Sequence, residues 1–448
     1  MTASAPADPP AHADPRVPGP DGGAGDAVSS PVPPGYPGAE ACSPAFTAAD
    51  YRRALEHSNL RGRPLSLALR LPFCQHGCFH CARQPVVTSD RRRADAYLSR
   101  LDREMVLLGR HLDAGREVQA LHWGGGSPTF LTLNQMSDLI DRLDARFRLA
   151  RGRDRDFGIE IDPRDADVFT LRHLEALGFN RLTLNVLDLD PRVLQAINRP
   201  QSRGLTERLL DEAARLGFRS LDLELTIGLP RQSTEGFAAT LEQVLAMAPA
   251  RLSLFSYVHR PDRFPPQHHI PEGDLPGSEA QRAMRRAAHA RLVDAGYVHL
   301  GWDRYARRGG GLKDAGTQWR RRVGHDVLGL GVGAVSHLEG AMARNAVRLA
   351  EFEAALDGGD LPTAGGRWLS MDDRLRARAI ETLMTRRTLD LEALGQAFAL
   401  DAAAELATAL ERLQAAGLVT RRGPRLDLVD AGTRWARELT RAFGVAGP

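Results

Sequence analysis

Cysteine is scarce in this sequence, with four residues in a chain of 448. Such low usage argues against a disulfide-stabilised secreted protein and fits a reducing cytoplasm. The sequence also has no apolar run of about 18 residues, the length at which a membrane-spanning helix is expected. Its first residues lack the charged and apolar regions of a secretory signal. We therefore expect a cytoplasmic protein without a membrane span.

Concentrated charge is missing as well. The formal net charge is +3 and the positive residues are dispersed, so nucleic-acid binding is not indicated. With 43% hydrophobic and 26% charged residues, the composition is that of an ordinary globular protein. At this length we expect one large domain and a smaller one.

Three of the four cysteines nevertheless lie close together. Cys74, Cys78 and Cys81 fall within eight positions with the spacing C-x3-C-x2-C. Three thiolates on one short loop can each bind one iron of a cubane cluster, which leaves the fourth iron without a protein ligand. A small molecule could bind and react at that open iron. The spacing therefore favours a [4Fe–4S] cluster.

Other uses of these cysteines remain to be weighed. A disulfide would leave one of the three unpaired, and nothing indicates an oxidising compartment. A structural zinc site with three cysteines and His76 or His80 stays open, although one isolated loop without a second ligand pair would be unusual. Cys42 lies near the end of the N-terminal segment, and we interpret it as an incidental thiol rather than a fourth ligand.

Residues 1–44 are rich in Pro, Ala, Gly and Asp and contain almost no large apolar side chains. Because such a segment cannot bury enough surface to offset its ordering entropy, we predict a disordered tail. Order is expected to begin near Thr47, which can cap a short helix over residues 50–56.

Beyond this point, apolar runs rich in β-forming residues alternate with stretches of helical period. The predicted strands are residues 66–71, 118–123, 157–161, 181–186, 220–227, 251–257 and 298–302. Helices are predicted between them, for instance over 94–112, and Thr132 with Gln135 forms a capping box for another. Gly178 and Gly217 each follow a helical stretch, where a left-handed residue would end the helix.

This alternation predicts an α/β fold with a parallel sheet, either doubly wound or wrapped as a barrel. In such sheets the chemistry lies at the carboxyl ends of the strands. The cysteine loop directly follows the first predicted strand, so we expect it at that edge.

The C-terminal part has a different pattern. We predict that the α/β domain covers residues 45–341 and that residues 342–369 link it to a smaller domain over 370–448. The smaller domain shows helical patterns over 372–386, 390–398 and 402–415, a hairpin over 418–428 and a last helix over 431–443. This order resembles a winged-helix module. Since no concentrated basic recognition helix is present, a packing or lid role is at least as consistent with the sequence as DNA binding.

The second predicted strand ends in Gly124-Gly125-Gly126-Ser127. Three glycines let the backbone approach a ligand closely and offer its N–H groups without side-chain obstruction. Glycines also make plain tight turns. One strand away from a cysteine loop, however, this motif could bind the amino and carboxylate groups of a cluster-bound amino acid.

Charged residues mark the next strands. Glu160 lies at the end of the third strand, where it would bind ribose hydroxyls or pair with an arginine. Glu224 lies in the fifth strand and allows the same two interpretations. Arg199 follows the fourth strand and would either pair a ligand carboxylate through its guanidinium or be an ordinary surface arginine.

With a cysteine loop after the first strand and a glycine loop after the second, the chain resembles the radical S-adenosylmethionine (SAM) superfamily. More closely, it is similar to the oxygen-independent coproporphyrinogen III oxidase (dehydrogenase) family. The likeness is carried by residues 64–67, 71–74, 121–129, 159–164, 178–182, 228–230 and 326–336 and by the C-terminal helical module.

The resemblance implies a partial parallel (β/α) barrel of the radical SAM type, with a [4Fe–4S] cluster on Cys74, Cys78 and Cys81. S-adenosyl-L-methionine would chelate the open iron. The residues that the resemblance assigns to this cofactor are Gly125, Gly126, Ser127, Glu160, Arg199 and Glu224, the last at a position where the family has aspartate. It further implies oxidative decarboxylation of a tetrapyrrole, coproporphyrinogen III, to protoporphyrinogen IX in heme biosynthesis. A reductant protein such as flavodoxin or ferredoxin would be the electron donor.

Several family positions differ in this chain. Ala68 and Arg70 stand where the family has the tyrosine and histidine of Tyr-x-His-x-Pro-Phe-Cys, and Arg83 replaces a fourth cysteine. Leu187 replaces a glutamine near the cofactor, and residues 315–321 replace the stretch Asn-Phe-Gln-Gly-Tyr-Thr-Thr. These replacements favour an alternative, a divergent paralogue that acts on another tetrapyrrole or substrate, for instance as a methyltransferase. A third hypothesis is a heme-binding, chaperone-like protein on the same scaffold.

Overall fold

The computed structural model of the chain describes residues 36–301, 304–309, 324–429 and 435–444. Residues 1–35 of the tail predicted over 1–44, the replaced stretch 315–321 and the start of the predicted last helix lie outside them. Within the described ranges, no helix is both long and apolar enough to cross a membrane.

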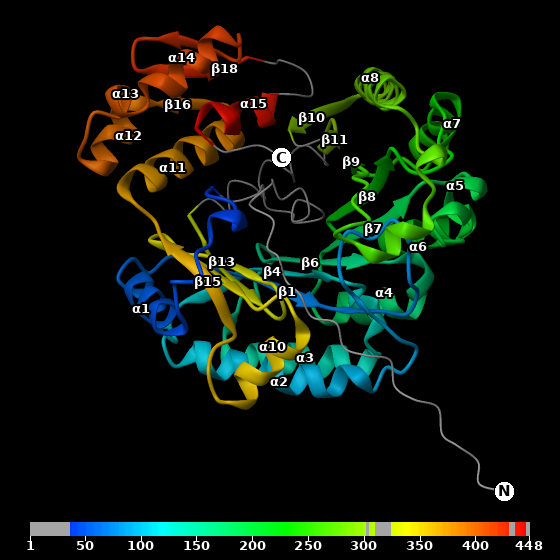
Figure 1. Ribbon diagram of the computed structural model, residues 1–448, viewed down its shortest axis with the longest axis horizontal. Coiled ribbons are helices and arrows are strands. Elements are labelled where there is room, and N and C mark those ends of the chain that lie inside the picture. The colour runs from blue at the N-terminus through cyan, green and yellow to red at the C-terminus, as the bar shows by residue number, and fades with distance from the viewer. Residues whose placement is uncertain (1–35, 302–303, 310–323, 430–434, 445–448) are drawn as a thin grey trace, which may run out of the picture.

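One large sheet organises most of the chain (Figure 1). In spatial order its strands are β10 (Tyr297–Gly301), β11 (Arg304–Arg307), β9 (Arg251–Ser256), β8 (Ser220–Ile227), β7 (Arg181–Leu187), β6 (Asp156–Ile161), β4 (Glu117–Gly125), β1 (Leu65–Leu71), β12 (Asp326–Leu330), β13 (Val335–His337), β14 (Ala341–Asn345) and β15 (Thr363–Trp368), with β5 (Arg148–Leu149) beside β4.

The strands from β1 through β4, β6, β7 and β8 to β9 are neighbours in chain order, and each pair is parallel. A doubly wound sheet reverses its order at a switch point, whereas sequential order is that of a barrel. Figure 1 shows these strands along an arc, with helices on its outer side. Among the described residues the sheet ends at β10 and β15. The prediction of an α/β partial parallel barrel is therefore confirmed.

The sequence accounts for where the helices begin and end. Capping boxes at Thr47 and Thr132 start the helices predicted there, and Gly178 and Gly217 have the left-handed φ values of 91° and 76° expected after a helix. The helices of this domain are α1 (Ala48–Asn59), α2 (Arg93–Gly109), α3 (Leu133–Arg146), α4 (Val168–Ala176), α5 (Pro191–Ala196), α6 (Arg203–Arg215), α7 (Thr234–Ala246), α8 (Ser278–Asp294) and α10 (Leu349–Asp357). Short 3₁₀ helices are η1 (Ala39–Ala41), η2 (Pro128–Phe130), η3 (Pro163–Asp165), η4 (Pro265–His269) and η5 (Glu272–Asp274).

Residues 342–369 do not form the predicted linker. β14 and β15 pair antiparallel and extend the large sheet, and α10 packs beside α2. The sequence obscures β15 because it contains Gly365 and Gly366, and glycine usually weakens a strand. A Cβ atom at Gly366 would lie 2.4 Å from the carbonyl oxygen of Met342 and 2.4 Å from the ring of Phe46. Glycine is therefore required there by close packing.

A smaller unit follows, and its buried residues form a separate apolar cluster from Leu375 to Phe443. Its elements are α11 (Met371–Arg386), β16 (Thr388–Asp390), α12 (Leu391–Phe398), α13 (Ala402–Glu405), α14 (Ala407–Ala415), β17 (Val419–Arg422), β18 (Arg425–Leu428) and α15 (Trp435–Ala442). The predicted order of helices and hairpin is present, although one predicted helix is divided at Leu406. The Glu381 carboxylate accepts a hydrogen bond of 3.2 Å from the Gly324 N–H and so ties this unit to the large domain.

The boundary of the tail predicted at residue 44 is wrong, because residues just before it contact the rest of the chain. Ser43 and Gly366 of β15 exchange two backbone hydrogen bonds, and Tyr36 packs against the smaller core. Cys42 therefore lies beside β15, the fourth strand along from β1. This position agrees with its interpretation as an incidental thiol.

Candidate active site

The cysteine loop follows β1 at its carboxyl end, as predicted. Cys74 lies in β2 (Phe73–Cys74), a two-residue strand that pairs with β3 (Val86–Val87), while Cys78 and Cys81 lie in the loop between these strands. The short β2–β3 pair fixes both ends of the loop. None of the three cysteines forms a disulfide, and each is half-buried.

The glycine loop after β4 is hydrogen-bonded to the residues that lead from β1 into the cysteine loop. The N–H of Gly126 donates to the carbonyl of Leu71, and the N–H of Ser127 donates to the carbonyl of Phe73, each at 2.7 Å. The N–H groups of Gly126 and Ser127 are therefore not available to a ligand, unlike what was expected of the glycine loop. Gly125 has φ +113°, and a Cβ atom on Gly126 would lie 2.4 Å from the Phe73 carbonyl oxygen. The glycines thus let two loops approach, and carbonyl oxygens are what the loop can offer an ammonium group.

The donor set suits a metal cluster. Burial, with the two neighbouring cysteines adding to it, raises the pKa of Cys74 to about 12, and burial also raises the pKa of Cys81. The thiols of Cys74 and Cys81 therefore need cationic charge bound beside them before both can be thiolates near neutral pH. A [4Fe–4S] cluster supplies that charge and takes one thiolate at each of three irons.

The same loop is not arranged around a single ion. Within the described ranges, no three His, Cys, Asp or Glu side chains converge closely enough to hold one metal ion. A cubane does not need such convergence, because each cysteine binds a different iron.

Two acidic residues predicted as cofactor ligands are buried on β6 and β8, the strands on either side of β7. Glu160 is 2% exposed, and its carboxylate lies 3.1 Å from Nε2 of His122 and 3.5 Å from Nη1 of Arg83. Burial, with the Glu160 carboxylate nearby, raises the pKa of Glu224 well above its usual value. One of these two carboxyl groups can therefore accept hydrogen bonds while the other holds a proton.

Arg83 also donates to the carbonyl of Gly125, so it joins the cysteine loop to the glycine loop and to β6. Burial alone would lower the pKa of Arg83, but the surrounding carboxylate and sulfur groups raise it. This arginine stands where the resemblance places a fourth cysteine. The sequence shows the replacement but not the contacts that it makes.

Arg199 lies beside the cysteine loop, as a cofactor ligand should. Its Nη1 atom lies 2.7 Å from Asp162 and 3.7 Å from the sulfur of Cys78, and its Nη2 atom donates to the carbonyl of Asn185. Its Nε atom is buried and has no hydrogen-bond partner among the described residues. A ligand carboxylate is the kind of group that would satisfy such a donor.

Sequence reasoning did not single out Arg164, whose Nη2 atom lies 3.2 Å from the sulfur of Cys78. Burial would raise the pKa of Asp162, but the guanidinium groups of Arg199 and Arg164 hold it well below its usual range. The carboxylate therefore stays ionised and holds both arginines near the cysteine. No local pattern reveals this contact, because Arg164 and Cys78 are 86 residues apart.

Ser127 is buried and belongs to a second small network beside the loop. Its hydroxyl lies 3.0 Å from the hydroxyl of Thr129 and donates to Asp165 at 3.0 Å. Asp165 in turn lies 3.4 Å from Nε2 of His76 on the cysteine loop. The side chain of Ser127 is therefore connected through Asp165 to the cysteine loop.

The other replaced family positions line the same end of the barrel. Arg70 donates to the carbonyl of Gly333 at 2.7 Å and so binds the loop after β12. Ala68, two residues earlier on β1, leaves a small side chain on the same face. Leu187 has a left-handed φ of 69° and packs into an apolar cluster that includes Phe79 of the cysteine loop.

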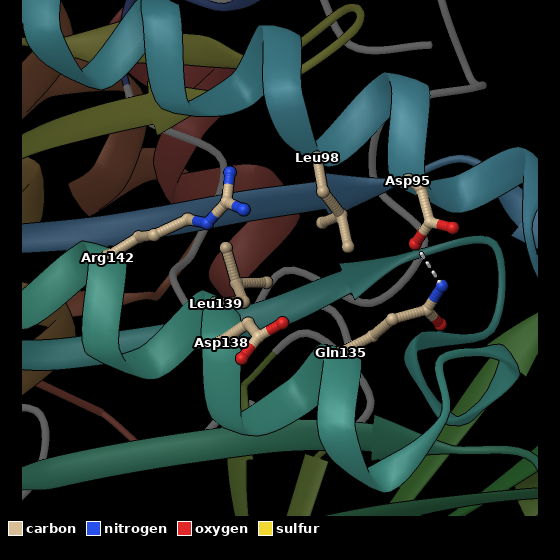
Figure 2. A pocket seen from close by; sticks show the side chains of 6 residues that line it. All are labelled: Asp95, Leu98, Gln135, Asp138, Leu139 and Arg142. Atoms are coloured by element: carbon tan, nitrogen blue, oxygen red, sulfur yellow. Dashed lines mark hydrogen bonds between the residues drawn. The ribbon is translucent and has the colours of Figure 1, made fainter.

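A hollow of about 210 Å³ lies elsewhere, between α2 and α3. Figure 2 shows that Asp95 and Gln135 face each other across it, joined by a hydrogen bond of 2.7 Å. The lining residues are Asp95, Leu98, Gln135, Asp138, Leu139 and Arg142, and none of them is a predicted site residue. The site therefore rests on the loops at the strand ends rather than on this surface hollow.

Comparison with known proteins gives two family matches. Residues 69–244 match the radical SAM superfamily, and residues 369–435 match the HemN C-terminal domain. The first match spans the cysteine loop, the glycine loop and the strand ends described above.

Individual relatives cover nearly the whole chain. An oxygen-independent coproporphyrinogen III oxidase of Pseudomonas aeruginosa is 36% identical over 93% of this chain and 93% of its own length. The enzyme of that name from Escherichia coli K12 is 36% identical over 73% of each chain. The solved structure of coproporphyrinogen III oxidase (HemN) from Escherichia coli, described as a radical SAM enzyme, has a TM-score of 0.84. It shares 32% identity and covers 92% of this chain and 96% of that chain.

Proposed function

The chain belongs to the oxygen-independent coproporphyrinogen III oxidase family of radical SAM enzymes, and from this we propose that it decarboxylates coproporphyrinogen III to protoporphyrinogen IX. The observation that carries the proposal is that Gly126 and Ser127 donate backbone hydrogen bonds of 2.7 Å to Leu71 and Phe73, the residues that lead into the Cys74–Cys81 loop. Heme biosynthesis is the pathway that this reaction serves.

Cys74, Cys78 and Cys81 would hold the [4Fe–4S] cluster. When bound, the cluster and S-adenosyl-L-methionine would supply a 5′-deoxyadenosyl radical able to take a hydrogen from the β-carbon of a substrate propionate. Each of the two reacting propionates would then lose carbon dioxide, and one electron to an electron acceptor, and become a vinyl group. The protein's own part is to bind, orient and shield these groups.

The remaining predicted residues would position S-adenosyl-L-methionine. The carbonyls of Gly125 and Gly126 suit its ammonium group, since the N–H groups of Gly126 and Ser127 are already bonded. The carbonyl of Gly125 would then accept from this ammonium group as well as from Arg83. Arg199 suits its carboxylate, because the buried Nε atom of the arginine needs an acceptor. The carboxyl groups of Glu160 and Glu224 suit the ribose hydroxyls, one as acceptor and one as donor.

The partners follow from the same chemistry. The substrate is a tetrapyrrole with propionate side chains, and one electron for each cofactor cleavage has to come from a reductant protein such as flavodoxin or ferredoxin. The cytoplasm, expected from the sequence, is the compartment that this proposal assigns.

The test is anaerobic reconstitution with iron and sulfide, followed by reductant, S-adenosyl-L-methionine and coproporphyrinogen III. Protoporphyrinogen IX is the expected product, detected after oxidation by its porphyrin absorbance and mass. Cys78→Ser should lose both iron and product, whereas Cys42→Ser should keep both, because Cys42 lies beside β15.

Other outcomes would contradict the proposal in distinct ways. Cofactor cleavage without loss of carbon dioxide would indicate the divergent radical enzyme, and a methylated product would indicate a methyltransferase. Stoichiometric heme binding without cofactor cleavage would indicate the chaperone-like protein.

A further inference from the structure

Of the three Asp-Pro-Arg tripeptides in the sequence, two lie in the part of the chain that the structure describes, and these two have the same local fold. At residues 162–164 and 190–192, the aspartate accepts a hydrogen bond from the arginine's own backbone N–H, at 3.0 and 2.8 Å. In both, the guanidinium also donates to that aspartate, with Nη2–Oδ2 distances of 2.7 and 2.8 Å. The two arginines are therefore held alike by their own segments.

Their surroundings differ. The side chain of Arg192 is 75% exposed, whereas that of Arg164 is 9% exposed and lies 3.2 Å from the sulfur of Cys78. Burying an arginine in this way is costly unless each donor finds an acceptor. The guanidinium of Arg164 thus has a cysteine sulfur as an additional acceptor, whereas that of Arg192 lies largely in solvent.

Asp162 also holds the guanidinium of Arg199 near the sulfur of Cys78. Arg199 donates to the Oδ2 atom of Asp162 at 2.7 Å and lies 3.7 Å from the Cys78 sulfur. Two arginines and one carboxylate carry a net charge of +1, so the Cys78 sulfur faces net positive charge. All three of these side chains are at most 10% exposed, so water screens this charge little.

The backbone on both sides of Cys78 is also held. The side chain of Asn198 donates to the carbonyl of Gly77 at 2.7 Å, and the N–H of Phe79 donates to the carbonyl of Ile197 at 3.0 Å. The backbone at Cys78 is therefore held next to the segment that carries Arg199. The contact is a built feature of the loop.

We propose that Arg164, held by Asp162, is a positioning residue that raises the reduction potential of the cluster bound at Cys78. A hydrogen bond to the sulfur and a nearby positive charge both favour the more negative, reduced cluster. The cluster then takes one electron more readily from its protein reductant. This inference rests on the proposed function, which supplies the cluster, and it assigns to Arg164 a role separate from binding S-adenosyl-L-methionine.

The test uses the reconstituted full-length protein without S-adenosyl-L-methionine or substrate. The cluster's midpoint potential is measured by a redox titration followed by electron paramagnetic resonance. For Arg164→Met, we expect the ratio of reduced to oxidised cluster at a fixed potential to fall about tenfold, which is about 59 mV for one electron. Arg164→Lys should show a smaller decrease, because it keeps the charge but loses the planar fork.

Arg192→Met is the matched control, since it removes the same side chain from the same tripeptide, and its potential should equal that of the wild type. Resonance Raman spectra give a second readout: loss of the N–H···S bond in Arg164→Met should shift an iron–thiolate stretch to higher frequency.

An unchanged potential in Arg164→Met, or an equal decrease in Arg192→Met, would overturn the proposal. If both Arg164 variants take up no iron, the arginine shapes the loop instead of tuning the cluster, and the proposal is again overturned. A wild-type chain that takes up no cluster would overturn the proposed function itself, and this inference with it.

Discussion

Nη1 of Arg83 lies 3.5 Å from Oε2 of Glu160, and this ion pair connects the cysteine loop to the end of β6. The glutamate is 3% exposed in its side chain and the arginine 20%, so the pair is largely shielded from water. The carboxyl group of Glu224 also contributes to the raised pKa of Arg83. The site thus holds two carboxyl groups around one cation.

Replacing that cation should destabilise the protein. In Arg83→Ala, we expect the free energy of unfolding of the cluster-free protein to fall by about 3 kcal/mol, because a buried carboxylate loses its partner. Urea denaturation followed by circular dichroism measures this change. Arg92→Ala is the control, since its side chain is 87% exposed beside Asp90, and it should change stability by less than about 0.5 kcal/mol. Equal effects of the two variants would contradict the ion pair's role.

Glu160→Gln should weaken cofactor binding without removing the cluster. We expect the dissociation constant of S-adenosyl-L-methionine to rise about tenfold, since a charged acceptor for a ribose hydroxyl becomes a neutral one. Equilibrium dialysis on the reconstituted protein measures the constant, and iron content is checked in parallel. Glu175→Gln changes an exposed glutamate of α4 and should leave both quantities unchanged. An unaltered affinity in Glu160→Gln would remove Glu160 from the cofactor site.

Gly125→Ala tests the close approach of the two loops. Its Cβ atom would lie 2.8 Å from the backbone nitrogen of Leu71, at a φ of +113°. Gly217→Ala is the control, because Gly217 also has a positive φ, +76°, but an added Cβ atom there meets no atom within 4 Å. This variant should lower the free energy of unfolding only by the cost of a left-handed alanine, about 1–2 kcal/mol. We expect Gly125→Ala to be clearly less stable than Gly217→Ala and to take up less iron on reconstitution. Equal stability and iron content would show that the loops do not need this contact.

Much of the fold can be predicted from the sequence, because its signals are local. β8 begins and ends where expected, at Ser220 and Ile227, since a run of β-forming residues is bounded by turn residues. The helices that start after Thr47 and Thr132 follow from capping boxes within four residues. β15 is not predictable in this way, because Gly365 and Gly366 serve its packing against Ser43 and Phe46, which are more than 300 residues away.

The candidate site likewise combines features that local sequence predicts with features that depend on distant residues. The cysteines and the glycine loop are short motifs, and the order of parallel strands brings them together. The direction of the Gly126 and Ser127 N–H groups depends on how β2 leaves β1, which no spacing reveals. The contact of Arg164 with Cys78 depends on how the cysteine loop, the segment after β6 and the segment around Asn198 pack together. It is visible only in the folded chain.

Glu104 should make stability depend on pH. Burial raises its pKa to about 8, although its carboxylate accepts hydrogen bonds from the Gly331 N–H at 2.8 Å and from Asn345. Because the folded chain holds the proton more tightly than the unfolded chain, this contribution is full below about pH 4.5 and is lost as the pH rises to about 8. Each pKa unit between the folded and unfolded chain corresponds to about 1.4 kcal/mol, so the contribution of Glu104 to the free energy of unfolding can change by several kcal/mol over this pH range.

Glu104→Gln removes this titration. We expect its melting temperature to match the wild type near pH 5 and to exceed it at pH 8, because the buried charge is absent. Differential scanning calorimetry of the cluster-free proteins measures both. A difference that is constant across this pH range would contradict the raised pKa.

The most direct measurement follows hydrogen from substrate to cofactor. The reconstituted enzyme is supplied with reductant, S-adenosyl-L-methionine and coproporphyrinogen III deuterated at the propionate β-carbons, and the 5′-deoxyadenosine formed is analysed by mass spectrometry. We expect one deuterium in 5′-deoxyadenosine for each carbon dioxide released. Unlabelled 5′-deoxyadenosine alongside unchanged coproporphyrinogen would contradict the proposed function.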